Sequence, residues 1–201
     1  MTELEKLRNG YAVDGMHPEL YAINLKAHNL SIEYSGLLED DPRRQEILDE
    51  LLGSHGQVYM RGPIYFNFGV NTHLGDGFFA NNDFHVSDDA EVRIGKRVMC
   101  GPHVSLITAT HPYIMEERMA MTDSQGNTFA PLLGNPITIE DGVFLGGGVI
   151  VLGGVTIGRG SVIGAGSVVT RDIPPGVIAA GNPCRVIREI GERDSIRDRV
   201  L

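Results

Sequence analysis

The amino-acid sequence predicts a mainly β fold, in which a parallel β-helix follows an α-helical N-terminal segment. Aliphatic residues recur at every sixth position through ITIEDGVFLGGGVIVLGGVTIGRGSVIGAGSVVTRDI, residues 137–173. Glycine supplies 26 of the 201 residues, whereas tryptophan is absent and aromatic residues make up only 6%. A period of six fits neither an α-helix, with about 3.6 residues per turn, nor a simple long strand, but it is typical of a solenoid of short strands and tight corners.

The repeat between residues 139 and 169 also predicts which residues stack. Its six aliphatic residues are Ile139, Leu145, Val151, Ile157, Ile163 and Val169. Three segments of six residues would close one triangular coil, so residues eighteen apart should stack: Ile139 on Ile157, Leu145 on Ile163, and Val151 on Val169. Neighbouring coils would pair as parallel strands about 4.8 Å apart, with the aliphatic side chains filling a narrow interior. Glycine often follows the aliphatic residue, because a corner favours a residue without Cβ.

Two shorter runs with the same interval precede this region: Leu74, Ala80 and Val86, and then Ile94, Cys100 and Leu106. The step from Val86 to Ile94 is eight residues, which indicates a two-residue insertion near Asp88 and Asp89. A bulge there could turn the Asp89 side chain toward a site. Cys100 falls at an inward-facing position, so we expect it in the core and not as an acyl acceptor.

The pattern stops close to a histidine. In LITATHPYIMEER, residues 106–118, the aliphatic register ends at Leu106, and it resumes near Ile137. We therefore expect residues 109–136 to form a loop that protrudes from the coil. Such a loop can carry His111 toward a neighbouring chain, and Pro112 restricts the backbone of His111.

The first 57 residues are rich in Leu and Glu and poor in glycine, which favours helices. HPELYAINLKAHNLSIEYSG predicts one helix, with Pro18 near its start and Gly36 after its end. DDPRRQEILDELLG predicts another, with Asp41 as N-cap, Pro42 at the first helical position and Gly53 as the stop. Its apolar face consists of Ile47, Leu48, Leu51 and Leu52. The expected organisation is a helical segment over 1–57, the β-helix over 58–180 with its loop at 109–136, and a C-terminal tail over 181–201.

Charge and composition exclude several classes of function. The formal net charge of −9 disfavours nucleic-acid binding, although a local basic patch remains compatible with it. The N-terminus MTELEKLRNG has no apolar signal region, and Cys100 and Cys184 lie far apart, so we expect two thiols in a cytoplasmic protein. No stretch approaches the roughly 18 apolar residues that a membrane span requires.

Several longer stretches together resemble the hexapeptide-repeat sugar O-acetyltransferases, the galactoside and maltose enzymes. They are YFNFGVNTHLGDGFFANNDF, ITATHP, GVTIGRGSVIGAGSVVTRDIPPG and AAGNPCRVIREI. The repeats alone occur in many transferases, whereas the combination of FFAN, TATHP and GNPCRVIR is much more specific. The resemblance covers nearly the whole chain. It implies a left-handed β-helix, acetyl-CoA as co-substrate, and a homotrimer with its sites between subunits.

His111 is the candidate general base, because acetyl transfer to a hydroxyl requires removal of the hydroxyl proton. Imidazole titrates near neutral pH, so it can accept that proton and pass it to the leaving thiolate. In the family that this chain resembles, the matching histidine has this role. We expect direct transfer in a ternary complex, without an acyl-enzyme.

The resemblance also points to residues that bind the acceptor: Asp14, Asn67, Asn81 and Asp89. Carboxylates and amides suit a polyol, because they make several hydrogen bonds at fixed angles. The predicted acceptor-binding residues combine features of the galactoside and the maltose enzymes. Galactoside enzymes carry Ser and maltose enzymes Asp where this chain has Asn67, while Phe79 matches the maltose type. The sugar and its hydroxyl are left open by the sequence.

For acetyl-CoA the resemblance implies a groove lined by small residues, with positively charged side chains at the end that binds the phosphates. Asn81 would contact it, together with Gly147, Ala165, Thr170, Arg171, Arg185 and Arg188. The backbone N–H of Gly147 could hold the tetrahedral oxyanion. Phe144 stands where many relatives have Trp. The arginines after Gly166 form a basic concentration that suits a polyanionic cofactor.

Three alternatives to a sugar acetyltransferase remain at this stage. The first is a hexapeptide acetyltransferase with a non-sugar acceptor, such as serine or an antibiotic hydroxyl. The second is a non-catalytic β-helix that serves as a binding module. The third is a metalloenzyme, which the histidine spacing disfavours, because neither His103 and His111 nor His73 and His85 show a close His-x4-His pattern. We expect no metal requirement.

Overall fold

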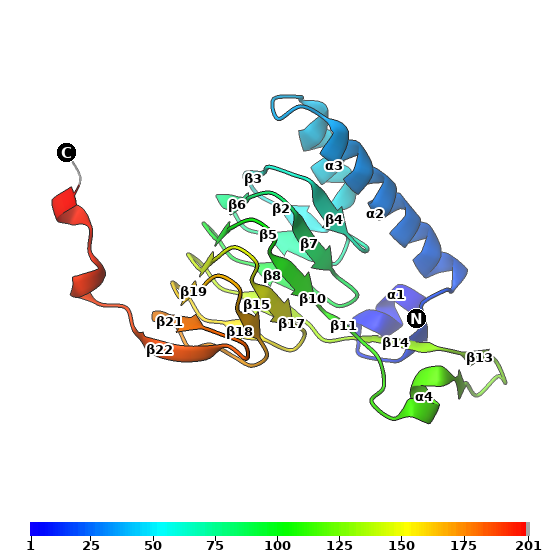
Figure 1. Cartoon of the computed structure of the whole chain (residues 1–201). Coiled ribbons are helices and arrows are strands. Elements are labelled where there is room, and N and C mark those ends of the chain that lie inside the picture. Colours follow the sequence, from blue (N-terminus) through cyan, green and yellow to red (C-terminus); the bar gives the residue numbers. More distant parts are fainter. Residues whose placement is uncertain (200–201) are drawn as a thin grey trace.

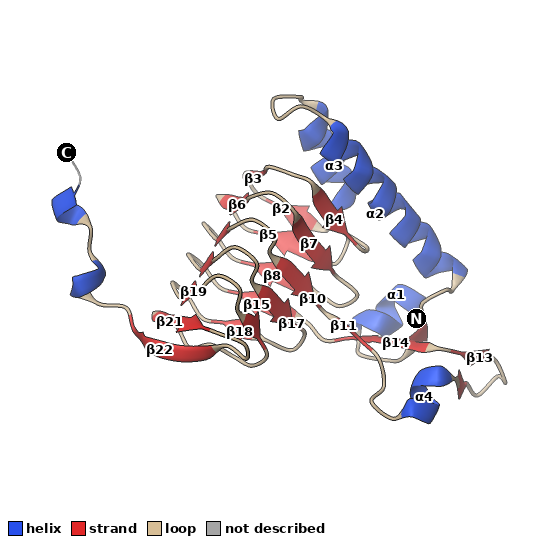
Figure 2. Cartoon of the chain, in the orientation of Figure 1, coloured by secondary structure: helices blue, strands red, loops and turns tan. Residues whose placement is uncertain are grey.

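The computed structural model describes residues 1–199 and shows a triangular parallel β-helix with three walls (Figures 1 and 2). The chain visits the walls in a fixed order, so each coil contributes one strand to each wall. The first wall contains β2 (Ser54–His55), β5 (Thr72–Leu74), β8 (Val92–Ile94), β15 (Ile137–Ile139) and β18 (Thr156–Ile157). The third wall contains β4 (Ile64–Phe66), β7 (Phe84–Ser87), β10 (Ser105–Ile107), β17 (Ile150–Leu152) and β20 (Val168–Val169).

The second wall is the largest and includes the last two strands of the chain. Its parallel strands are β3 (Val58–Met60), β6 (Phe78–Ala80), β9 (Met99–Cys100), β16 (Phe144–Leu145), β19 (Val162–Ile163) and β21 (Val177–Ala180). The tail then turns back, and β22 (Arg185–Glu189) pairs antiparallel with β21. Two short 3-10 helices follow, η1 (Glu192–Asp194) and η2 (Arg197–Arg199).

The strand register confirms the stacking that the sequence predicts. Ile139 pairs with Ile157, Leu145 with Ile163, and Val151 with Val169. The two earlier runs stack in the same way, with Leu74 beside Ile94, Ala80 beside Cys100, and Val86 beside Leu106. These residues are buried in one continuous core. The predicted fold class, a mainly β solenoid with an N-terminal helical segment, is therefore confirmed.

The helical segment packs on the first coil. Helix α2 (Pro18–Gly36) packs against β4, and α3 (Arg43–Leu51) packs beside α2 (Figure 1). The predicted apolar face of α3 is buried. The N-cap residue is Pro42 and not the predicted Asp41, although Asp41 accepts a hydrogen bond from the Arg43 N–H. Helix α2 includes Gly36 as its last residue, so its end lies one residue beyond the prediction. A further short helix, α1 (Glu3–Arg8), has a capping box formed by Thr2 and Glu5.

The segment between the third and fourth coils leaves the β-helix (Figure 1). It contains β11 (Ala109–Thr110), α4 (Met115–Met119), β12 (Met121–Thr122), β13 (Thr128–Phe129) and β14 (Pro131–Gly134). Strand β14 pairs on one side with β11 and on the other with β1 (Val13–Asp14). This small sheet ties the N-terminal segment to the loop, and the coil resumes at Ile137.

Cys100 is 1% exposed, and burial raises the pKa of its thiol well above the usual range. The thiol therefore stays protonated at neutral pH, which agrees with the predicted core position.

In residues 1–199, no helix is long and apolar enough to cross a membrane.

Candidate active site

His111 lies directly after β11, where the chain has left the third wall, and its side chain is exposed. Its Nδ1 lies 2.8 Å from the carbonyl oxygen of Pro131 in β14. A carbonyl oxygen can only accept a hydrogen bond, so Nδ1 carries the proton and donates it. In the neutral ring this leaves the lone pair on Nε2. The small sheet thus sets the tautomer that a general base requires.

Asp89 and Asn67 meet beside this histidine, at the corner between the third and first walls. The Asn67 side-chain amide donates to Asp89 Oδ1 at 2.9 Å, while Asp89 Oδ2 is buried without a hydrogen-bond partner in residues 1–199. Burial raises the pKa of Asp89 to about 6, and the nearby His111 partly opposes that shift. A buried acceptor without a donor is costly. Asp89 Oδ2 can therefore accept a hydrogen bond from a hydroxyl group of a bound molecule.

Two residues that were not predicted as site residues make hydrogen bonds at this corner, Asn24 to Asn67 and Asp88 to the residues that follow Asn67. Asn24, on α2, donates to the side-chain and main-chain oxygens of Asn67 at 2.7 and 2.9 Å. Asp88 is fully buried and accepts from the Phe68 N–H at 2.8 Å and from the Thr72 hydroxyl at 3.0 Å. The only sequence signal for Asp88 was the insertion beside Asp89. Asn24 gave no signal, because a polar residue on a helix is usually solvated.

Asp14 lies in β1, a two-residue strand within the N-terminal segment. It is the Cα partner of Pro131, the residue whose carbonyl oxygen holds His111. One carboxylate oxygen of Asp14 accepts from the Met16 N–H at 3.0 Å. The structure therefore brings Asp14 to the strand that orients His111.

The remaining predicted residues divide between two corners of the triangle. Asn81, Gly147 and Ala165 follow strands of the second wall and lie at its corner with the third wall. Thr170 and Arg171 follow β20 and lie at the other end of the third wall, on the side of Asp89. A four-residue strand such as β7, at about 3.3 Å per residue, separates the two corners by about 13 Å. One chain therefore does not bring Asn81 to Asp89.

The corner between the second and third walls offers unpaired backbone donors. The N–H groups of Gly147 and Ala165 have no hydrogen-bond acceptor in residues 1–199, whereas Gly146 and Gly166 donate to neighbouring coils. Gly147 is partly exposed and Ala165 is exposed. Such N–H groups can receive a carbonyl oxygen or an oxyanion.

The predicted arginines of the tail lie on β22. Arg185 donates to the Cys184 carbonyl oxygen at 2.7 Å. Arg188 forms a two-pronged ion pair with Asp194, at 2.7 and 2.6 Å, and this pair lowers the pKa of Asp194 far below its usual range. Arg188 would have to exchange this carboxylate for a phosphate in order to bind a cofactor.

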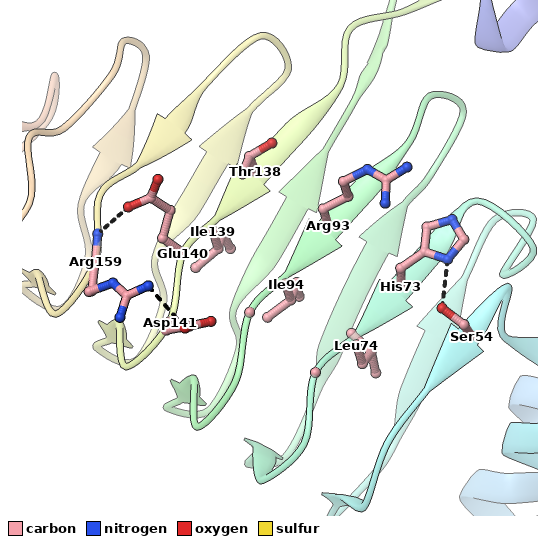
Figure 3. A pocket seen from close by; sticks show the side chains of 12 residues that line it. Ser54, His73, Leu74, Arg93, Ile94, Thr138, Ile139, Glu140, Asp141 and Arg159 are labelled. Carbon is pink, nitrogen blue, oxygen red and sulfur yellow. Dashed lines mark hydrogen bonds and ion pairs between the residues drawn. The ribbon is translucent and has the colours of Figure 1, made fainter.

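A groove of about 380 Å³ crosses the first wall, but its charged groups already have partners (Figure 3). Arg159 forms an ion pair with Asp141 at 3.3 Å, and its N–H donates to Glu140 at 2.7 Å. The groove contains none of the predicted site residues. The candidate active site is therefore the region around His111 and not this groove.

In the part of the chain that the structure describes, no group of three or more His, Cys, Asp or Glu residues could hold a metal ion.

Comparisons with known proteins agree with this architecture. The family model described as "Bacterial transferase hexapeptide (six repeats)" matches residues 136–171. The galactoside O-acetyltransferase of Escherichia coli (strain K12) is 38% identical over 96% of this chain and 92% of its own length. A maltose O-acetyltransferase from Clostridium difficile 630 superposes with a TM-score of 0.86 and 40% identity, covering 96% of this chain and 99% of the other. A galactoside acetyltransferase solved in complex with coenzyme A also has a TM-score of 0.86, with 38% identity over 96% of this chain and 94% of the other.

Proposed function

This chain belongs to the hexapeptide-repeat acetyltransferases, and from that premise we propose that it transfers the acetyl group of acetyl-CoA to a sugar hydroxyl. The sugar oxygen attacks the thioester carbonyl while its proton passes to His111. The tetrahedral intermediate then collapses, the C–S bond breaks, and His111 returns the proton to the CoA thiolate. The products are an acetylated sugar and free CoA.

The observation that carries this proposal is the hydrogen bond from His111 Nδ1 to the Pro131 carbonyl oxygen. It leaves Nε2 as the unprotonated nitrogen on an exposed side chain. A general base must be unprotonated and within reach of the substrate proton before it can act. The tautomer and the exposure of His111 both meet these requirements.

The carboxylates beside His111 support a polyol as the acceptor. The buried, unpaired Oδ2 of Asp89 can accept a hydrogen bond from one sugar hydroxyl, and Asn67 keeps Asp89 in place. A ligand that lacked the hydroxyl would leave this oxygen unpaired, which disfavours apolar acceptors. Asp14 would contact the same acceptor from the N-terminal segment.

The division of the predicted residues between two corners supports a site built by two copies of the chain. His111, Asp89 and Asn67 would come from one copy, and Asn81 and Gly147 from its neighbour. A closed ring of three copies with their third walls inward would bring these corners together. The proposed assembly is a homotrimer with three equivalent sites.

The second copy would also supply most of the acetyl-CoA groove. The unpaired N–H of Gly147 would stabilise the oxyanion, and that of Ala165 would contact the pantetheine chain. Thr170 and Arg171 would close the groove from the first copy. Arg185 and Arg188 would approach the phosphates, with Asp194 displaced from Arg188.

No acyl-enzyme is needed in this scheme. Cys100, the residue that could act as a nucleophile in the coil, is buried with a raised pKa, so it does not supply a thiolate. An acetylated residue trapped during turnover would contradict direct transfer.

A thiol-release assay tests the proposed function. Purified protein receives acetyl-CoA and one acceptor from a panel of galactosides, glucosides, maltose, serine and hydroxylated antibiotics. We expect release with at least one sugar, and a fall in kcat of about 10²–10⁴-fold for His111→Ala with acetyl-CoA binding retained. Release with serine or an antibiotic alone would identify a non-sugar acceptor. A protein that neither binds CoA nor releases thiol would be a binding module.

A further inference from the structure

A polar pocket of about 530 Å³ lies between the N-terminal segment and the hairpin formed by β12 and β13. We call it the hairpin pocket. Its polar lining includes Glu3, Lys6, Asp14 and His17 on one side and Asp123, Ser124 and Gln125 on the other. Both segments lie at the same end of the molecule, at the lower right of Figure 1. Apart from Asp14, the lining of this pocket has no role in the proposed reaction.

The hairpin pocket adjoins the proposed catalytic centre through Pro131. Asp14 lines the pocket and is the Cα partner of Pro131 in the ladder of β1 and β14. Paired Cα atoms in such a ladder lie about 4.5–5.5 Å apart. The carbonyl oxygen of the same proline holds His111. A molecule with one hydroxyl at His111 can therefore extend past Asp14 into the pocket.

The lining offers hydrogen-bonding groups that have no protein partner. The side-chain amide of Gln125, the Oδ2 atom of Asp14 and the Nε2 atom of His17 make no hydrogen bond within residues 1–199. His17 Nδ1 accepts from the Glu19 N–H, so Nε2 is the protonated nitrogen in the neutral ring and can donate. Together these groups provide both donors and acceptors, as the hydroxyls of a sugar require.

The charges of the lining favour a neutral occupant. Glu3, Asp14 and Asp123 contribute three carboxylates, against one ammonium from Lys6. Lys6 already forms an ion pair with Glu3 at 2.5 Å. An anionic group would therefore meet a net negative surface, whereas a neutral polyol would not.

The size of the pocket suits one sugar unit with some water. The volume lies inside the range of about 300–1,000 Å³ that is usual for small-molecule sites. At about 30 Å³ per water molecule, the pocket would hold on the order of fifteen waters or more, compared with about a dozen heavy atoms in one hexose unit. Phe129 adds an apolar surface on which the carbon face of a ring can lie.

We propose that the hairpin pocket is a second acceptor subsite that binds a neutral sugar unit, so that the preferred substrate is a glycoside of at least two units. This inference rests on the proposed function, because it assumes that a sugar hydroxyl lies at His111. It narrows the substrate class from sugars in general to disaccharides and longer oligosaccharides.

The test compares kcat/KM for glucose, maltose and maltotriose in the thiol-release assay. For the wild type we expect maltose to exceed glucose by at least about tenfold, which corresponds to about 1.4 kcal/mol of added binding. Gln125→Ala should lower kcat/KM for maltose by about 3–10-fold. Ser124→Trp should fill the pocket and remove the advantage of maltose. Both variants should leave the value for glucose within about twofold.

Thr122→Ala is the matched control, because Thr122 lies in the same hairpin and does not line the pocket. It should leave kcat/KM unchanged for both glucose and maltose. Equal kcat/KM for glucose and maltose in the wild type, or an equal loss for both in Gln125→Ala, would overturn the subsite and leave the proposed function intact. Thiol release with serine but with none of the sugars would refute the proposed function and the subsite together. Melting curves of the variants identify any loss of kcat/KM that comes from unfolding of the protein.

Discussion

At the scale of single residues, His111 depends on a carbonyl oxygen that lies twenty residues away in the sequence. The Pro131 oxygen fixes the proton on Nδ1 and thereby frees Nε2. The motif ITATHP identified the histidine as a candidate base, but it contained no information on the tautomer. That information comes from the pairing of β11 with β14, which brings residues 109–110 beside residues 133–134.

Asp88 gives a prediction on pH and stability. Burial raises its pKa from the usual 3.8 to about 6. The folded protein therefore keeps a proton that the unfolded chain loses near pH 4, so this stabilisation is complete below about pH 4 and is lost as the pH rises through 6. Asp88→Asn cannot ionise and avoids that loss. We expect the free energy of unfolding of the variant, relative to wild type, to rise by on the order of 2–3 kcal/mol between pH 4 and pH 7.

Melting temperatures at pH 4, 5, 6 and 7 measure this difference. Asp40→Asn, at an exposed position in the turn before α3, is the control and should keep a constant offset from wild type. A constant offset for Asp88→Asn as well would show that Asp88 is already ionised in the folded protein at low pH.

The sequence predicted residues of the site near His111, but it did not predict the residue that holds them in position. Asn67 and Asp89 were predicted as site residues, and the structure places them in contact. Asp14 was predicted as a site residue, but its position in β1 was not predicted, because a two-residue strand is too short to show a periodic pattern. Asn24 was missed because its role depends on a long-range contact with Asn67, which local sequence does not encode.

At the scale of elements, α2 does more than cover the first coil. Its Asn24 donates two hydrogen bonds to Asn67, which in turn donates to Asp89. The helix therefore positions two of the predicted acceptor-binding residues. The sequence predicted the helix from its start and stop signals, but it indicated only a structural cap with no defined role in the site.

Asn24→Ala should remove the hydrogen bonds that position Asn67 and should leave the proposed acetyl-CoA groove unchanged. We expect KM for the sugar to rise by about 3–10-fold, the size expected for the loss of one or two hydrogen bonds, with an unchanged Kd for acetyl-CoA. Steady-state kinetics and calorimetry measure the two quantities. Lys26→Ala, an exposed position on the same helix, is the control and should alter neither. A parallel rise in KM and in the Kd for acetyl-CoA would contradict a positioning role.

Adjacent glycines in the coils leave different amounts of space for a Cβ atom, so alanine substitutions test their roles separately. A Cβ at Gly146 would lie 2.6 Å from the backbone nitrogen of Ala165 in the next coil, whereas a Cβ at Gly147 would lie 3.3 Å from Pro102. We expect Gly146→Ala to destabilise the fold by about 1–3 kcal/mol. Gly147→Ala should destabilise less and should mainly weaken acetyl-CoA binding.

Thermal melts and calorimetric titration with acetyl-CoA measure both effects. Equal loss of stability in the two variants, with equal acetyl-CoA affinity, would mean that Gly147 serves only the corner. The six-residue repeat predicted that glycines occur at corners, but it did not distinguish a packed corner from one that faces a ligand.

At the scale of the whole molecule, the triangular cross-section keeps the two halves of the proposed site apart. The corner with His111 and Asp89 lies at one end of the third wall, and the corner with Asn81 and Gly147 lies at the other. The six-residue period predicted the coil and its register, because stacking depends on local spacing. It did not predict how the chains assemble, because the surfaces that meet between copies leave no period in the sequence.

Mixed assemblies test the central claim that one copy supplies His111 and its neighbour supplies Asn81. His111→Ala and Asn81→Ala chains are each purified alone and are also co-expressed with two different tags, so that only mixed assemblies are recovered. Each variant alone should be nearly inactive. In every mixed trimer, about one site in three would pair an intact His111 with an intact Asn81 from the next chain.

Thiol release with a sugar acceptor should therefore return in the mixed assemblies, to roughly a third of the wild-type rate per site. A trimer of chains carrying both substitutions is the control and should remain inactive. Mixed assemblies that stay as inactive as the single variants would contradict the account, because His111 and Asn81 would then have to act from the same chain.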